Sequence, residues 1–304
     1  MVQMPALQDL CLFIDDPIVE TSSLGQLNAS NCSSLHVRDT TPLADMLNPV
    51  LPSLRALTID HCVSWKFPST FPGTLARCTQ LRSCTITFPP DLFFEALEPI
   101  VLPELVELSL EWPFLFEPSS IFRALHIPKL QLLRLSHLSP NLILQRRTIS
   151  TLRSLIQSTT ALKHLIIMGC NLLTQGEAFS FLREAKFLER LKILYSKRCD
   201  LFLVPLTPPN CPNIRRRICP NLTHVTISGI QDMDVRPIVN IAKSRSNRQA
   251  KIPEDGKFLK ELALDSNLFD LTRQSRLLLL SELLSLHPDL YIMGPFGELL
   301  SLTQ

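Results

Sequence analysis

The chain has 304 residues, of which 45% are hydrophobic and 19% charged, and its formal net charge is +2 at pH 7. This composition excludes an intrinsically disordered chain, and no aliphatic run approaches the roughly 20 residues that span a bilayer. Roughly one residue in five is leucine, an excess that favours one architecture repeated along the chain over two unrelated domains.

A short pattern of apolar residues at positions 0, 3 and 5 recurs along the whole chain. Before a weaker last copy at His287, its copies start at Leu7, Cys32, Leu54, Leu81, Leu105, Leu130, Leu162, Leu188, Leu222 and Leu259. The last two apolar positions alternate, as on one face of a short strand, and no single copy can bury that face alone. The copies lie about 22 to 37 residues apart, which predicts a single leucine-rich-repeat solenoid over 1–304, with about 10 to 11 irregular repeats.

The segments between the predicted strands show helical patterns in most copies. In chain order we expect helices over 41–50, 91–100, 148–158, 174–185, 232–244 and 271–286. Two of them carry clear apolar faces, made of Ile149, Leu152, Leu155 and Ile156 in one and of Ala178, Phe181, Leu182 and Ala185 in the other. Parallel inner strands with outer helices predict an α/β horseshoe of the ribonuclease-inhibitor type. Loop-rich insertions are expected near 203–217 and 243–257.

Motifs for catalysis or cofactor binding are absent from the sequence. It contains no nucleophile elbow, metalloprotease helix, P-loop or dinucleotide fingerprint, so we expect no enzyme and no cofactor. Cys211, Cys219 and His224 match no standard zinc-finger spacing, so no metal site is expected. The 9 cysteines are scattered and the first residues lack a secretory signal, which favours reduced thiols in the cytoplasm, the nucleus or both.

Three segments carry a resemblance to a known family: 51–62 (LPSLRALTIDHC), 160–193 and 219–247. They resemble the F-box/leucine-rich-repeat proteins that are expanded in mushroom-forming fungi. In that family a Cys-Pro-x-Leu strand is commonly followed by an acidic helix start and by Ser-Arg at the helix end. The corresponding residues here are Cys219, Pro220, Leu222, Asp232, Ser244 and Arg245. The resemblance implies a repeat solenoid that recognises the substrate of a cullin–RING ubiquitin ligase.

The sequence departs from that family at its N-terminus. Family members usually begin with an F-box, a small helical module that binds the Skp-type adaptor, whereas this sequence begins in a repeat strand at Leu7. We therefore expect adaptor binding only if an F-box lies upstream. The missing polar cap favours a truncated product, and the alternative is a stand-alone repeat protein with no ligase link.

Function in such a horseshoe is expected on the concave face, which is formed by the exposed strand positions. For binding a protein partner we select Asp60, His61, Phe88, Glu107, Glu111, Trp112, Arg134, His137, His164, Arg190, Lys192 and Tyr195. The same rule also selects Phe13, His36, Arg38, Met168, His224, Glu261 and Asp265. Trp112 and Tyr195 are of special interest because aromatic residues and Arg are enriched among binding hot spots. The alternative is that these are ordinary solvated positions, or that Trp112 covers the edge of a repeat.

Two basic clusters stand outside the strands. One is the run 215–217, and the other contains Lys243, Arg245, Arg248, Lys251 and Lys257. Such clusters can bind nucleic acid, anionic lipid or an import receptor. Because the net charge is small and no aromatic residues interleave with the clusters, we interpret them as solvated loop and helix-end charges. Neither nucleic acid nor membrane is therefore expected as a partner.

Overall fold

The chain forms an α/β fold whose main sheet has ten strands, in agreement with the predicted class. It divides into two compact units, which are described separately: Met1–Leu138 with Ser150–Ala161, and Ser139–Ile149 with Leu162–Gln304. The computed structural model describes residues 2–3, 7–13, 27–28, 31–38, 50–60, 71–88, 97–113, 118–137, 142–143, 145–171, 174–196, 199–207, 218–228, 236–246, 257, 259–264 and 281–282.

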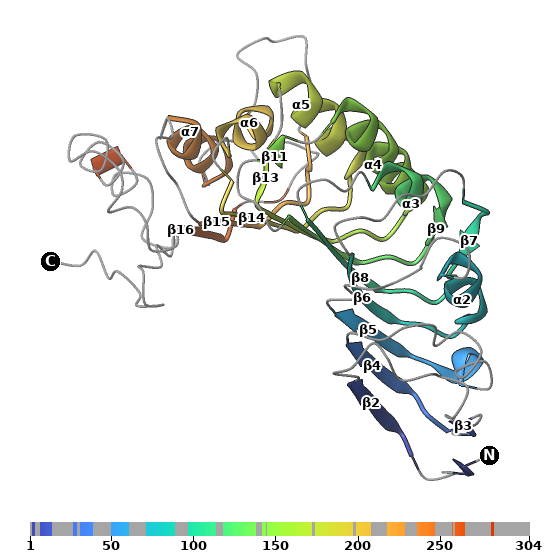
Figure 1. Ribbon diagram of the computed structural model, residues 1–304. Helices are drawn as coiled ribbons and strands as arrows, with labels where there is room; N and C mark the ends of the chain where they lie inside the picture. The colour runs from blue at the N-terminus through green and yellow to red at the C-terminus, as the bar shows by residue number, and fades with distance from the viewer. Residues whose placement is uncertain are drawn as a thin grey trace, which may run out of the picture. The chain divides into compact units, whose positions relative to one another are not determined.

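The first unit contributes six strands to the main sheet (Figure 1). Each pairs in parallel with the next, in the order β2 (Asp9–Phe13), β4 (Ser34–Arg38), β5 (Ala56–Asp60), β6 (Ser83–Thr87), β8 (Glu107–Trp112) and β10 (Leu132–His137). Two small parallel pairs accompany them, β1 (Val2–Gln3) with β3 (Leu27–Asn28) and β7 (Ile100–Val101) with β9 (Leu125–His126). The helical elements are η2 (Leu51–Ser53), α2 (Phe71–Arg77) and α3 (Ser119–Ala124).

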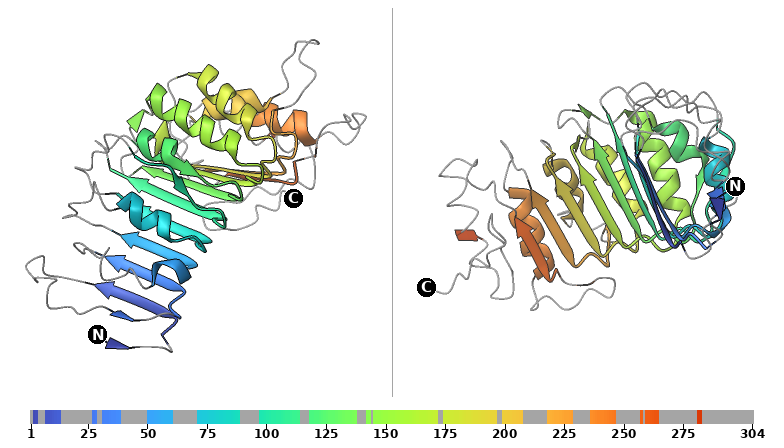
Figure 2. Two further views of the ribbon diagram at one scale, coloured as in Figure 1. Left: turned by 90° about the vertical axis from the view of Figure 1, so that its right-hand side faces the viewer. Right: turned by 60° about the horizontal axis from the view of Figure 1, so that its bottom comes forward.

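The second unit contributes four strands, which also pair in parallel. Their order is β12 (His164–Met168), β14 (Arg190–Leu194), β15 (His224–Ser228) and β16 (Glu261–Leu264). A small pair joins β11 (Leu142–Ile143) to β13 (Cys170–Asn171). The helical elements are α5 (Gln175–Glu184), α6 (Asp200–Leu203), η3 (Val204–Leu206) and α7 (Arg236–Ser246), and α5, α6 and α7 lie on one side of these strands (Figures 1 and 2). The remaining helix, α4 (Arg146–Ser158), contributes residues to both units.

The predicted apolar pattern forms the core of both units. All three positions are buried in every copy from the one that starts at Cys32 to the one that starts at Leu259. Equivalent positions pair across neighbouring strands, for example Leu57 with Cys84 and Leu191 with Val225. Each buried leucine stabilises the fold by roughly 1.5–3 kcal/mol relative to exposure. In the first copy Leu7 and Leu10 are half-buried, as befits a strand at the edge of the sheet, and the copy at His287 lies outside the described residues.

At the start of eight strands of the main sheet, one backbone carbonyl accepts two N–H groups; these strands are β4, β5, β6, β8, β10, β14, β15 and β16. The Glu189 carbonyl accepts from Thr223 (2.9 Å) and His224 (3.1 Å), and the Thr223 carbonyl accepts from Lys260 (2.7 Å) and Glu261 (3.1 Å). The same arrangement recurs in the first unit, where the Arg82 carbonyl accepts from Val106, just before β8, and from Glu107, the first residue of β8. The register of successive strands is therefore set at their first residues, independently of the length of the connection between them.

Two of the predicted helices match closely. The expected segment 148–158 lies in α4, and 174–185 contains α5, whose apolar faces are both buried as predicted. Thr174 caps α5, because its side chain accepts from the Glu177 N–H while the Glu177 carboxylate accepts from the Thr174 N–H. The segment 232–244 is represented by α7 from Arg236 onwards. The expectation of a helix is wrong for the end of 91–100, because 97–99 are not helical and Ile100 begins β7. Only residue 50 of 41–50 and the helical residues 281–282 of 271–286 are described.

Both predicted loop insertions begin in regular structure, and 208–217 and 247–256 lie outside the described residues. Leu203 ends α6 and is followed by η3, and Leu203 and Leu206 are both buried. Residues 243–246 belong to α7. The basic and proline residues suggested loops at these places, but Leu203 and Leu206 pack in the core and Arg245 is also buried. The prediction of a single solenoid over 1–304 stays a prediction.

Candidate functional site

Alternation along each strand leaves one face of the sheet for the core and one for solvent. In the first unit the solvent face carries Glu107 and Arg134, which are exposed, and Asp60 and Glu111, which are half-buried. In the second unit it carries the exposed Arg190 and Lys192 and the half-buried His164. These seven selected residues lie where the sequence placed them, whereas His61 is outside the described residues. Whether any of them binds a partner stays a prediction.

The prediction of exposure is wrong for three of the selected residues. Phe88, Trp112 and His137 are only 2%, 0% and 4% exposed. Each comes two residues after the third apolar position of its repeat, so the alternation turns its side chain to the core face. Trp112 packs edge-on against Phe122 of α3 (ring centroids 6.3 Å apart) and against His137 (6.0 Å). Continuing the period-2 pattern by one more position would have revealed this from the sequence.

Tyr195 occupies the equivalent position of its repeat but is 55% exposed. Its backbone has a φ of 53°, in the left-handed region, and the equivalent Gly169 on the preceding strand has a φ of 66°. Both N–H groups donate 2.9 Å hydrogen bonds to the next strand, Gly169 to Leu194 and Tyr195 to Ser228. The turn at the end of both strands thus places one residue in the left-handed conformation. In β14 this residue is Tyr195, and the turn directs its side chain to solvent.

We expect Tyr195→Gly to stabilise the second unit by about 1 kcal/mol, because glycine adopts the left-handed conformation without the steric cost that tyrosine meets. Little burial is lost, since the ring is exposed. Urea denaturation followed by circular dichroism measures the change. Tyr195→Ala is the matched control, because it removes the ring but keeps the Cβ. An equal effect of both substitutions would show that the ring, and not the backbone, sets the stability.

One outward position on each of the four strands of the second unit forms a row across the sheet. Strand pairing places His164 beside Arg190, Arg190 beside His224, and His224 beside Glu261. Each of these residues is the second after the first apolar position of its repeat. Neighbouring strands are about 4.8 Å apart, so this cross-strand row spans roughly 14 Å. Lys192 lies two residues after Arg190 on β14, and therefore on the same face of the sheet.

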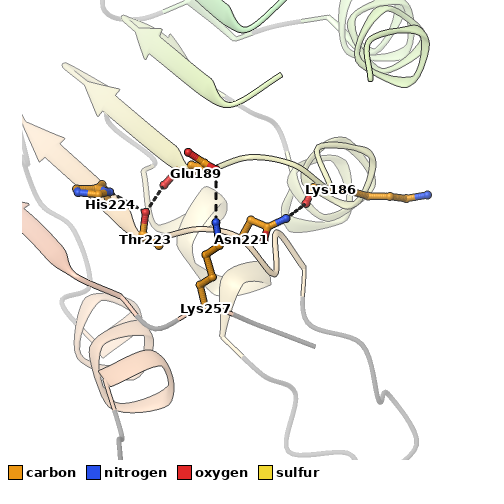
Figure 3. A network of polar contacts seen from close by, with 6 residues as sticks. All are labelled: Lys186, Glu189, Asn221, Thr223, His224 and Lys257. Carbon is orange, nitrogen blue, oxygen red and sulfur yellow. Dashed lines mark hydrogen bonds and ion pairs between the residues drawn. The ribbon is translucent and has the colours of Figure 1, made fainter. Parts of the chain in front are cut away.

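His224 is oriented by a hydrogen-bonded chain at the start of β15 (Figure 3). The Thr223 hydroxyl donates to the Glu189 carbonyl (3.2 Å), and its oxygen lies 2.7 Å from Nδ1 of His224. Since a hydroxyl has one hydrogen to donate, we infer that Nδ1–H of His224 donates to Thr223. Nε2 then remains free to take a proton, 3.9 Å from the Glu261 carboxylate. The Glu189 carboxylate pairs with Lys257 at 3.5 Å.

The environment of the row lowers the pKa of both imidazoles. For both His164 and His224, burial is the largest cause of the lowered pKa, and the positive charge of the Arg190 guanidinium is the second largest. The Glu261 carboxylate opposes this effect at His224, and Glu189 opposes it at both histidines. Both side chains are therefore neutral at neutral pH, and Arg190 with Lys192 provides the positive charge of the face.

The lowered pKa values predict that acid weakens the fold. Below pH about 6.5 the unfolded chain binds protons on these histidines that the folded chain does not, so the free energy of unfolding falls as pH decreases. The effect is complete once the pH is below the lowered pKa values of the folded state. Urea denaturation across pH 5 to 8 measures it. The double variant His164→Gln/His224→Gln should show a smaller slope than the wild type, and an unchanged slope would assign the pH dependence to other groups.

Arg245 does not belong to a solvated basic cluster. It is 1% exposed, and its guanidinium donates to the carbonyls of Leu206 (3.2 Å), Cys219 (3.1 Å) and Ile218 (2.5 Å). It thereby ties α7 to η3 and to the segment before β15. By contrast, Lys243 and Lys257 are more exposed and pair with Glu282 and Glu189. The run 215–217 lies outside the described residues.

The described cysteines and helices show no further site. Cys219 is buried and donates to the Leu182 carbonyl (3.3 Å), and burial raises the pKa of its thiol to about 12. Within the described ranges, no cluster of three or more His, Cys, Asp or Glu side chains is arranged to hold a metal ion. No helix in the described part of the chain has the length and apolar character needed to cross a membrane.

The sequence matches no model of a protein family and no curated protein at a significant level.

Proposed function

We propose that this chain is a non-catalytic scaffold that binds another protein on the exposed face of its parallel sheet. The observation that carries the proposal is the cross-strand row, in which four successive strands of the second unit present His164, Arg190, His224 and Glu261 in register. Lys192 extends this surface along β14, and Tyr195 is exposed in the turn just after that strand. Arg and Tyr are enriched among the residues that dominate binding energy, and the sheet holds the residues of the row at fixed spacing.

The proposed architecture is a leucine-rich-repeat solenoid. Its support is the repeated burial of three apolar positions, the parallel pairing of equivalent strands and the shared carbonyl at the start of eight main-sheet strands. Together with the sequence resemblance, these features favour the substrate-recognition part of a ubiquitin-ligase receptor of the F-box type. In that role the exposed sheet face would hold the substrate, and a Skp-type adaptor would bind an F-box rather than this surface.

Affinity purification with a charge-reversed face tests the proposal. The face variant is Arg190→Glu/Lys192→Glu, and the matched control is Arg183→Glu/Lys186→Glu, which makes the same charge change on α5 and the turn that follows it. We expect quantitative mass spectrometry to find at least one protein that is captured by the wild type and the control but lost with the face variant. In the ligase role, that protein should also have a longer half-life in cells that produce the face variant. Identical captured sets for the two variants would contradict binding at this face.

A further inference from the structure

We propose that the face around β14 binds an extended acidic segment of the protein partner, with carboxylates on Arg190 and Lys192, and that binding is accompanied by proton uptake on the flanking histidines. The inference rests on the proposed function and names the chemistry of its partner. Both cations are exposed, and neither has an ion-pair partner among the described residues. Their positive charge is therefore available to an incoming anion.

The spacing of the two cations fits an extended peptide. Arg190 and Lys192 are two residues apart on one strand, so their Cα atoms are about 6.6 Å apart, which is also the distance between alternate residues of an extended partner. A segment with acidic residues at alternate positions can therefore place one carboxylate on each cation. The Arg190 guanidinium can accept a carboxylate in a bidentate arrangement, which gives direction as well as charge.

The surrounding charges favour an acidic protein segment over a nucleic acid. Lys163 and Lys260 are exposed at neighbouring strand starts, and Glu189 is already paired with Lys257. At the end of the row, however, Glu261 places a negative charge beside His224. A nucleic acid carries about one charge per 1.7 Å of duplex and needs a continuous run of cations. A local pair of carboxylates next to Arg190 and Lys192 matches this mixed surface better.

The two histidines make the binding sensitive to pH. Arg190 lies between them in the row, and its positive charge is one of the causes that keep both neutral. His164 also faces Lys163, Glu189 and His224, while His224 faces Lys260, Glu189 and Glu261. A carboxylate bound to Arg190 offsets the guanidinium charge and adds a negative charge next to both imidazoles. Protonation then becomes more favourable in the complex than in the free protein, so binding and proton uptake are linked.

A labelled peptide with glutamate at alternate positions and serine between them tests the inference with the full chain. The control peptide has glutamine in place of glutamate. We expect fluorescence anisotropy to show at least about tenfold tighter binding of the glutamate peptide. Its affinity should increase from pH about 7.5 to about 5.8, where the carboxylates of the probe are still ionised. Calorimetry in two buffers of different ionisation enthalpy should report net proton uptake.

Two double variants distinguish the contribution of the cations to affinity from the contribution of the histidines to proton uptake. Arg190→Gln/Lys192→Gln should weaken binding of the glutamate peptide about tenfold or more at both pH values, whereas Arg183→Gln/Lys186→Gln should leave it unchanged. His164→Gln/His224→Gln should still bind at the higher pH but lose the proton uptake.

Several outcomes would overturn the inference. They are equal binding of the two peptides, no effect of the Arg190/Lys192 variant, no proton uptake, or tighter binding of an oligonucleotide of equal charge. If the purified partner still depends on Arg190 and Lys192 in any of these cases, the proposed function stands and only the acidic segment is rejected. If the peptide binds as expected but the face variant captures the partner as well as the wild type does, the proposed function fails instead.

Discussion

Arg245→Lys should lower the free energy of unfolding of the second unit by about 3 kcal/mol, although it preserves the charge. The planar guanidinium donates to three carbonyls that come from η3 and from the segment before β15. A lysine ammonium is a point charge on a flexible stem and cannot reach all three in the same geometry. At least one carbonyl and part of the charge are then left buried without compensation, and each unsatisfied buried group costs about 1–3 kcal/mol.

The measurement must report on the second unit. Urea denaturation followed by circular dichroism gives the overall stability, and hydrogen exchange of the amides in β15 and α7 locates the change. Lys243→Gln is the matched control on the same helix, since Lys243 is more exposed and its pair with Glu282 should contribute no more than about 1 kcal/mol. Equal stability of the two variants would mean that Arg245 is solvated, as the sequence had suggested.

Trp112→Ala should destabilise the first unit by about 3–5 kcal/mol, because it removes the largest fully buried side chain among the described residues and leaves a cavity. The indole fills the space between Phe122 of α3 and His137 of β10, so its loss separates a helix from the sheet that it covers. Trp112→Phe should cost clearly less than the alanine variant. It keeps most of the aromatic packing, and it removes an indole N–H that has no hydrogen-bond partner among the described residues.

Thermal or urea denaturation compares the two tryptophan variants, and hydrogen exchange in β8 and β10 assigns the effect to the first unit. The order wild type, phenylalanine, alanine is expected for a buried ring. If instead Trp112 were an exposed anchor for a partner, both substitutions would change stability by less than about 0.5 kcal/mol. The experiment thus distinguishes the burial found in the structure from the exposure predicted from the sequence.

The strands of the main sheet could be predicted from the sequence because their pattern depends on local spacing, whereas the short strands such as β7 and β9 carry no such pattern and were not predicted. The positions that start at Cys32, Leu54 and Leu81 need only alternation and repetition to be recognised. The helices α4 and α5 could also be predicted from the sequence, since each carries an apolar stripe. The helix α2 was not, because Pro72 and Gly73 weaken the helical pattern in its first turn.

The candidate site was only partly predictable from the sequence. The members of the cross-strand row all come two residues after the first apolar position of their repeat, so aligning the repeats would have grouped them. Alternation alone could not predict the direction of the Tyr195 side chain, because Tyr195 itself adopts the left-handed conformation where β14 ends. Arg245 was misread for another reason: its acceptors at Leu206 and Cys219 lie 39 and 26 residues away in the sequence, so only the folded chain brings them together.

The shared carbonyl at strand starts has a consequence for how this surface can change. Since two N–H groups are bound to one carbonyl at the start of eight main-sheet strands, an insertion in the connection that precedes such a strand leaves it in place. The distance between two outward side chains is then the same whether the intervening segment is short or long. A substitution at one outward position alters the chemistry of the face without moving its neighbours. The recognition surface can therefore diversify one residue at a time, while the length of the connecting segments varies independently.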